Sequence, residues 1–355
     1  WNGILNMPHS RWPAVQGGAL ALVAAALFGV STPLVQLAGD GVGAFSTASL
    51  LYVGAALIGL LTRQSPEREA RLRRGDLPRL LAMALFGAGI GPVALAWGLQ
   101  KTSGTSASLL LTLEALFTAL LARVLYGESM DRRVWGAMLL LMGGGIVLVL
   151  DQGRTGQMHL IGLLAVMAAT IAWGVDNALS RGVADRDPGQ VVLGKAMLGA
   201  AMTTAVAALT GESMPGWPAA LALVAIGATG YGLSLRFYLL AQRAFGASRT
   251  GSVFAFAPFI GAAVAMALGE PGIGWGGVIG SALMVAGVVL HLAESHHHEH
   301  QHRALEHDHA HTHEDGHHQH RHEVMPRGAH SHPHRHEPMT HAHAHVPDQH
   351  HDHGH

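Results

Sequence analysis

Ten long apolar runs, each of about 20 residues, lie before residue 293 and constrain this chain more than any other feature. The hydrocarbon core of a bilayer is about 30 Å thick, and a helix needs about 20 apolar residues to cross it. The runs are rich in Gly, Ala and Leu, and helices satisfy their own backbone hydrogen bonds in lipid, whereas open strands do not. We therefore predict an all-α polytopic membrane protein with helices at 14–38, 43–62, 77–99, 104–125, 133–151, 159–180, 190–209, 217–240, 247–268 and 273–292.

Basic residues gather on one side of these predicted helices. One set of alternate loops holds Arg11, Arg63, Arg68, Arg71, Arg73, Arg74, Arg79, Arg123, Arg132, Arg133, Arg181, Arg186, Arg243 and Arg249. The other set holds only Lys101 and Arg154. Because Lys and Arg accumulate in cytoplasmic loops, both termini are predicted to be cytoplasmic, in the inner membrane of a bacterium. The chain begins at Trp1, and Met7 is a candidate start.

An internal repeat relates the two halves. A shift of 142 residues aligns 99–150 with 241–292 without a gap, and it matches Gln100 with Gln242, Gly104 with Gly246, Ser106 with Ser248, Phe117 with Phe259, and Gly127-Glu128 with Gly269-Glu270. Each half then contains five helices, and because five is odd the second half is inverted. Inverted repeats are typical of secondary transporters that alternate access around a site in mid-membrane.

The stretch from Gly104 to Leu150 resembles one transporter family. Gly104-Thr105-Ser106-Ala107-Ser108 opens a helix, Leu113-Glu114 lies within it, and Tyr126-Gly127-Glu128 closes it before Trp135-Gly136. In these residues the chain is similar to the drug/metabolite transporter superfamily, EamA type, over about residues 14–292. The resemblance implies ten helices in two five-helix repeats. Ala115 stands where the family usually has Pro after the membrane Glu, which removes the basis for expecting a kink there.

The resemblance also implies a function. Members of the family transport small metabolites, amino acids or drugs, often outward, and a fold alone does not identify the substrate. Two alternatives stay open: a divalent metal exporter loaded by the tail, and a membrane metal sensor or buffer that transports nothing. An enzyme is not expected, because the sequence shows no nucleophile–base arrangement, phosphate loop or ATP-binding domain.

Ionisable groups within a bilayer are costly and usually face a cavity or a partner. Glu114 is the first candidate for the pathway, because its repeat counterpart is Phe256 and the symmetry of the scaffold does not explain a carboxylate. It could bind a proton or a cationic substrate, or be a hydrogen-bonded structural residue. Asp176 and Asn177 occupy places that match Ser31 and Thr32, so these two pairs could line a pathway. The alternative is a structural role, in which Asp176 forms an ion pair with Lys195 or Arg236.

Aromatic side chains complete the candidate set. Trp97, Tyr231, Phe254 and Phe256 could form an aromatic wall, with Arg236 beside the pathway, although such rings more often fill helix interfaces or mark the membrane boundary. No cofactor is expected for the bundle. The expected partners are the lipid bilayer and a small-molecule or ion substrate, with no nucleic acid, and a homodimer stays open.

The C-terminal tail has a different composition from the bundle. Of the 60 residues from His296 to His355, 24 are His, mixed with Glu, Asp, Gly and Pro, which cannot build an apolar core. Neutral imidazole suits zinc, nickel, cobalt and copper(II). The candidate ligands alternate with other residues and are His307, His309, His311, His313, His330, His332, His334, His336, His341, His343 and His345. The tail could deliver, sense or buffer metal, or be a tolerated extension.

The sequence therefore predicts four segments. Residues 1–13 precede the first five-helix repeat at 14–151, the inverted repeat follows at 152–292, and a disordered, cytoplasmic, His-rich tail occupies 293–355.

Overall fold

The computed structural model describes residues 12–65, 69–126, 132–153, 157–245, 247–270, 274–292, 296–301, 305–311, 330–336 and 340–345. The first half contains α1 (Trp12–Ala38), α2 (Ala44–Thr62), η2 (Arg74–Asp76), α3 (Leu77–Met83), η3 (Ala84–Ile90), α4 (Gly91–Leu99), α5 (Gly104–Leu110), α6 (Leu113–Tyr126) and α7 (Arg132–Gly153). The second half contains α8 (Gln157–Ser180), η4 (Arg181–Val183), α9 (Pro188–Thr210), α10 (Trp217–Ile226), η5 (Gly227–Leu233), α11 (Ser234–Phe245), α12 (Ala247–Phe254), α13 (Ala257–Ala267) and α14 (Trp275–Leu292).

The outer surface of the helix bundle is apolar. Leu61, Leu209, Trp217 and Trp275 are each more than three quarters exposed. Within the described residues, eight helical stretches are long and apolar enough to cross a membrane, and two shorter apolar helices lie at 257–267 and 275–290. These two fall within the predicted spans 247–268 and 273–292. A surface of this kind needs lipid, because soluble proteins rarely expose such large apolar areas.

The two halves share unusual local features. A π-helical segment occupies η3 in the first half and η5 in the second, and the two segments lie 143 residues apart. The fourth pass is interrupted between α5 and α6 at Leu111–Thr112, and the matching pass is interrupted between α12 and α13 at Ala255–Phe256. The first break occurs although Ala115 is not Pro, so it does not depend on the proline that the family usually has. Local irregularities of this kind are costly and do not arise twice by chance at matching places.

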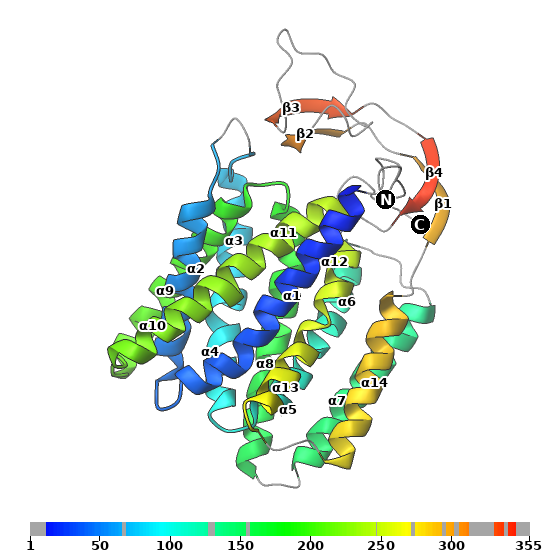
Figure 1. Cartoon of the computed structure of the whole chain (residues 1–355). Coiled ribbons are helices and arrows are strands. Elements are labelled where there is room, and N and C mark those ends of the chain that lie inside the picture. Colours follow the sequence, from blue (N-terminus) through cyan, green and yellow to red (C-terminus); the bar gives the residue numbers. More distant parts are fainter. Residues whose placement is uncertain are drawn as a thin grey trace, which may run out of the picture.

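Helix contacts repeat in the same way. α2 packs on η5 while α9 packs on η3, and α1 packs on α11 and α13 while α8 packs on α4 and α6. α2 and α9 contact each other, as do α7 and α14, so these pairs join equivalent helices of the two halves. Figure 1 shows that α1 begins and α14 ends at the same end of the bundle. The contact pattern is that of two repeats related by a pseudo-two-fold axis.

Close approach of α2 to α10 and η5, which follow one another directly, joins the two halves. A Cβ atom added at Gly227 would lie 1.9 Å from the carbonyl oxygen of Leu51, and one added at Gly54 would lie 2.0 Å from that of Val224. Small residues allow such backbone contact between membrane helices, where no hydrophobic force draws the helices together. Glycine at both positions is therefore a packing requirement.

The arginine-rich end of the bundle is fastened by polar contacts. Arg243 donates to both carboxylate oxygens of Glu69, at 3.0 and 2.8 Å, and Arg186 Nε lies 3.0 Å from Asp76 Oδ2. Burial raises the pKa of Glu69 above its ordinary value, and Arg243 opposes that shift. The Asp187 N–H donates to the Ala70 carbonyl at 2.8 Å. These contacts join the α2–α3 connection to the second half.

Part of the tail forms paired strands, where we expected disorder. β1 (His296–Gln301) pairs antiparallel with β4 (Thr340–His345), and β2 (Leu305–His311) pairs antiparallel with β3 (His330–His336). The expectation rested on the lack of apolar side chains, whereas backbone pairing between extended segments needs none. Figure 1 places these strands beyond the helix bundle.

The glycine contact gives a stability prediction. Gly227→Ala forces α2 and η5 apart, and overpacking of this kind costs about 1–3 kcal/mol of unfolding free energy. The measurement is reversible unfolding of the purified protein in mixed detergent micelles. Gly143→Ala is the matched control, because an added Cβ there meets no atom within 4 Å. Equal stability of the two variants would contradict the packing role of Gly227.

Candidate functional site

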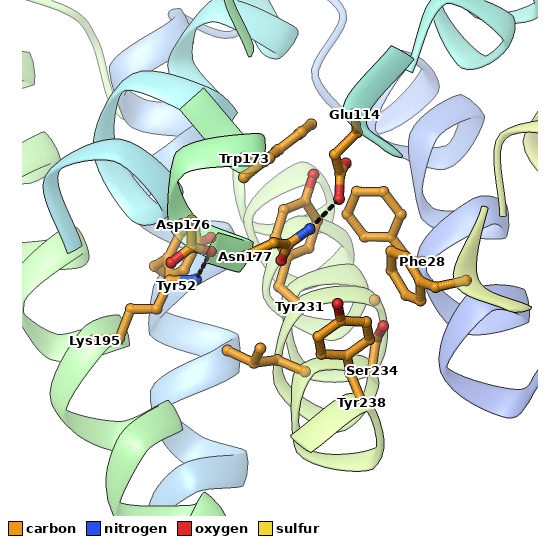
Figure 2. A pocket seen from close by; sticks show the side chains of 13 residues that line it. Phe28, Tyr52, Glu114, Trp173, Asp176, Asn177, Lys195, Tyr231, Ser234 and Tyr238 are labelled. Carbon is orange, nitrogen blue, oxygen red and sulfur yellow. Dashed lines mark hydrogen bonds and ion pairs between the residues drawn. The ribbon is translucent and has the colours of Figure 1, made fainter. Parts of the chain in front are cut away.

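A small cavity lies between the two halves, and both halves supply its walls (Figure 2). Its lining comes from α1, α2 and α6 of the first half and from α8, α9, η5, α11 and α12 of the second. The lining residues are Phe28, Tyr52, Glu114, Trp173, Asp176, Asn177, Lys195, Gly230, Tyr231, Ser234, Leu235, Tyr238 and Phe254. We call this space the central cavity.

Two polar pairs lie side by side in the wall of the central cavity. Asn177 donates to Glu114 Oε1 at 2.5 Å, and Lys195 donates to Asp176 Oδ2. The side chains of Lys195 and Asp176 are only 4% and 5% exposed. A buried ion pair is tolerated because each charge neutralises the other, whereas a lone buried charge is very costly. Figure 2 shows both pairs, with Asp176 and Asn177 adjacent on α8.

Some polar atoms of the central cavity have no partner. Asp176 Oδ1 and the Tyr231 hydroxyl are buried and form no hydrogen bond with the part of the chain that the structure describes. Buried polar atoms without partners cost about 1–3 kcal/mol each unless a water or ligand satisfies them. The cavity therefore offers an acceptor and a hydroxyl to whatever enters it.

Aromatic rings form the other wall of the central cavity. Phe28 makes edge contacts with Trp173 and Tyr231, at centroid distances of 5.5 and 5.8 Å, and lies 5.4 Å from Phe254. Tyr238 packs edge-on against Phe254 at 5.0 Å. Edge-to-face pairs of this type are favourable and fix ring orientation. The rings present a rigid, largely apolar surface beside the charged groups.

The π-helix of the first half fixes two of the cavity side chains. The Gly87 carbonyl accepts a hydrogen bond from the Tyr52 hydroxyl at 2.5 Å and from the Trp173 indole N–H at 3.0 Å. Glycine is needed here for space as well, because a Cβ at Gly87 would lie 2.3 Å from the Asp176 carboxyl carbon. At the matching place in the second half, a Cβ at Gly230 would lie 2.4 Å from Ser31 Cβ. Asp176 and Ser31 therefore occupy equivalent positions against equivalent glycines.

The central cavity is too small in this conformation for a metabolite. Its volume is about 50 Å³, enough for a few water molecules, whereas ligand pockets usually measure about 300–1,000 Å³. Any larger ligand must therefore enter through a movement of the surrounding helices.

The structure brings five of the predicted residues to the central cavity, namely Glu114, Asp176, Asn177, Tyr231 and Phe254. The alternative prediction that Asp176 pairs with Lys195 is confirmed. Ser31 and Thr32 are buried on α1 next to this region, and the Ser31 hydroxyl donates to the Phe28 carbonyl at 2.6 Å.

Three other predicted pathway residues lie elsewhere. Trp97 is 40% exposed, and Lys101 Nζ lies 4.6 Å from its ring centroid. Arg236 Nη1 donates to the Thr62 carbonyl at the end of α2, at 3.3 Å. Phe256 packs against Phe259, with a centroid distance of 6.4 Å. None of the three lines the central cavity, since α4 contributes no residue to it, Phe256 lies in the break between α12 and α13, and Arg236 contacts the end of α2.

Sequence reasoning missed several lining residues. The sequence-based candidates do not include Phe28, Tyr52, Trp173, Ser234 or Tyr238. A signal exists for two of them, since Phe28-Gly29-Val30 and Trp173-Gly174-Val175 lie at matching places in the two halves, and Phe28 meets Trp173 at the cavity.

The ion pair gives a second prediction. Lys195→Met leaves the Asp176 carboxylate buried without its counter-charge, which costs about 3–5 kcal/mol of unfolding free energy. Adding Asp176→Asn removes the uncompensated charge, so the double variant should recover most of that loss. The measurement is a double-mutant cycle from unfolding in detergent. Losses that simply add would show that the two side chains are not coupled.

Comparison with known proteins places the chain among transporters. The sequence profile of the EamA-like transporter family matches residues 15–150 and again residues 160–293. An uncharacterized transporter of Methanothermobacter thermautotrophicus (strain Delta H) is 24% identical over 295 residues, covering 77% of this chain and 86% of that protein. The uncharacterized transporter YyaM of Bacillus subtilis (strain 168) is 26% identical over 207 residues, covering 54% and 65%.

The fold is also found among solved structures. A crystal structure described only as that of a protein matches with a TM-score of 0.57 and 20% sequence identity, over 78% of this chain and 97% of the other. At that identity the match shows a shared fold and nothing about substrate.

Proposed function

This chain belongs to the EamA-like transporter family, within the drug/metabolite transporter superfamily, and from that premise we propose that it is a gradient-driven exporter of small metabolites, amino acids or drugs. In this proposal ten helices cross the inner membrane of a bacterium, and both termini are cytoplasmic. The excess of Arg at one end of the bundle supports this orientation. In this proposal α12 and α13 together form the ninth crossing and α14 forms the tenth.

The observation that carries the proposal is the position of the central cavity. It lies between two repeats with matching irregularities, and it holds charged groups within helices that otherwise face lipid. Inverted-repeat transporters place their sites at the repeat interface and rock one half against the other. A cavity that is too small for a substrate in this conformation fits an intermediate between outward and inward access.

Glu114 is the group that we propose to couple transport to an ion or proton gradient. It follows the break between α5 and α6, it lines the central cavity, and its described partner there is the neutral Asn177. Asp176, in contrast, is held by Lys195. A carboxyl that faces a neutral amide can accept a proton or a cation without breaking an ion pair.

Removing that carboxylate should abolish export. Glu114→Gln keeps the size of the side chain but cannot change its charge, so we expect export to fall by about a hundredfold or more, as for loss of a general proton-transfer group. The measurement compares metabolites in the medium of cells that express the native chain, the variant or neither, by untargeted mass spectrometry.

Glu212→Gln is the matched control for this experiment. Glu212 accepts hydrogen bonds from the Phe45 and Ser46 N–H groups and lies outside the central cavity. Export by the Glu212→Gln variant should therefore stay near the native level. Undiminished export by the Glu114 variant would remove the proposed role of this carboxyl.

We propose a second property, divalent metal binding, for the tail. The strand register sets His307 opposite His334, His309 opposite His332, and His311 opposite His330. His345, His343 and His341 are likewise set opposite His296, His298 and His300. Directly opposed positions on antiparallel strands are about 4.5–5.5 Å apart, close enough for two imidazoles to share an ion.

The arrangement within the described residues is not a finished metal site. No three His, Cys, Asp or Glu residues come together there as a ready group of ligands, and His313 lies outside those residues. The profile match to the family ends at residue 293, so the tail is additional to the transporter. Zinc, nickel or cobalt would therefore bind by gathering histidines from the paired segments.

Truncation tests the metal proposal. The full chain should bind several zinc or nickel ions in equilibrium dialysis, and the chain cut after Glu294 should lose nearly all of them, because the bundle offers few nitrogen ligands. Metabolite export by the truncated chain should be unchanged. Equal metal binding by both chains would contradict the proposal, and loss of metal efflux on truncation would favour a metal exporter instead.

A further inference from the structure

A second cavity opens at one end of the bundle. The arginine-rich loops lie at the opposite end. The cavity is lined by the end of α1, the start of α2, the α4–α5 turn and His159 near the start of α8. Its volume is about 540 Å³, which suits a metabolite, and it shares no lining residue with the central cavity. We call it the outer polar pocket.

Hydrogen bonds hold the frame of the outer polar pocket. Gln36 Nε2 donates to the carbonyls of Leu99 and Thr102, at 3.3 and 3.2 Å. Gln100 Nε2 donates to the Val42 carbonyl at 2.8 Å. These bonds tie the α1–α2 turn to the α4–α5 turn across the pocket. The frame is therefore built by side chains that reach between elements distant in sequence.

Three polar atoms in this lining have no partner in the described chain. They are Thr47 Oγ1, Thr102 Oγ1 and His159 Nδ1. Thr47 and Thr102 are 1% and 5% exposed, so bulk water does not account for them. Buried groups are normally paired, and buried hydroxyls of cavity-lining residues that have no protein partner indicate a ligand or bound water.

Both signs of charge line the outer polar pocket. Lys101 and Asp40 contribute an ammonium and a carboxylate, and Lys101 is held near the Trp97 ring. No ion pair between the two is found in the described structure. Separate opposite charges suit a molecule that carries one of each.

We infer that the outer polar pocket is a second substrate site, which takes hydrophilic zwitterions bearing a carboxylate and an ammonium on their way out. This inference rests on the proposed export function and names its substrate class. Lys101 and the two threonine hydroxyls receive the carboxylate, and Asp40 receives the ammonium. The aromatic central cavity and this polar pocket are then two successive sites on one path.

Binding of small probes tests the inference. L-glutamine carries both charges, glutaramate lacks the amine, and 4-aminobutanamide lacks the carboxyl. With the purified full chain in lipid nanodiscs, radiolabelled L-glutamine should bind and neither analogue should compete well. Thr47→Val with Thr102→Val should weaken L-glutamine binding about tenfold, the expected loss for two hydrogen bonds. Lys101→Met should abolish the preference for L-glutamine over 4-aminobutanamide, which lacks the carboxylate. Asp40→Asn should abolish the preference for L-glutamine over glutaramate, which lacks the amine.

Controls separate binding from folding and from transport. Thr118→Val removes another buried hydroxyl without a partner in the described chain, but outside the pocket, and should leave binding unchanged. The double valine variant should unfold no more readily than the native chain, because its hydroxyls have no protein partner. Glu114→Gln should retain L-glutamine binding even where export is lost. Native binding by the double variant, equal binding of all three probes, or no binding of any would overturn the inference.

Discussion

A bilayer supplies no hydrogen-bond partners, and this constraint decides where every polar group of the bundle can lie. Backbone groups are satisfied within helices, and the irregular segments recruit side chains: the carbonyl of Gly87 in η3 is taken up by Tyr52 and Trp173. In the described lining of the central cavity, charged groups occur as the Asp176–Lys195 pair and as Glu114 beside Asn177. Some of the buried polar atoms without a partner in the described chain lie at the central cavity, on Asp176 and Tyr231, and others lie at the outer polar pocket, on Thr47, Thr102 and His159.

The scaffold is symmetric and the chemistry is not. η3 and η5, and the two helix breaks, repeat at matching places, and Gly87 and Gly230 make room for Asp176 and Ser31 in turn. Yet Glu114 has Phe256 as its counterpart, and Asp176 has an uncharged Ser31. A symmetric frame of this kind is typical of inverted-repeat folds, whereas the charged groups of the cavity lie at positions that have no charged counterpart in the other half.

Much of this arrangement was predictable from the sequence. Apolar run length located the helices, and the landmarks Gly104, Phe117 and Glu128 with their counterparts indicated the repeat. The position of Glu114 and Asp176 within apolar runs identified them as costly charges in lipid and therefore as candidate functional residues. The strands of the tail were not expected, because the absence of a core says nothing about backbone pairing between distant segments.

Other features could not be predicted, because they depend on helix rotation. Trp97 and Phe256 are candidates by residue type, but neither lines the central cavity, whereas Tyr52 and Tyr238 do. The sequence has no proline at Leu111–Thr112 that would indicate a break in the helix there. A stripe of Gly, Ala and Leu carries almost no signal for which face turns inward, so the lining of the cavity requires the packed structure.

The central claim is that the cavity between the two repeats is reached alternately from the two sides of the membrane. The native chain has no cysteine, so a single cysteine placed at Tyr231 can be labelled alone. A membrane-impermeant maleimide should react with it in right-side-out vesicles and also in inverted vesicles, with the balance shifted by an imposed pH gradient. Labelling from one side only, under every gradient, would contradict alternating access at this site.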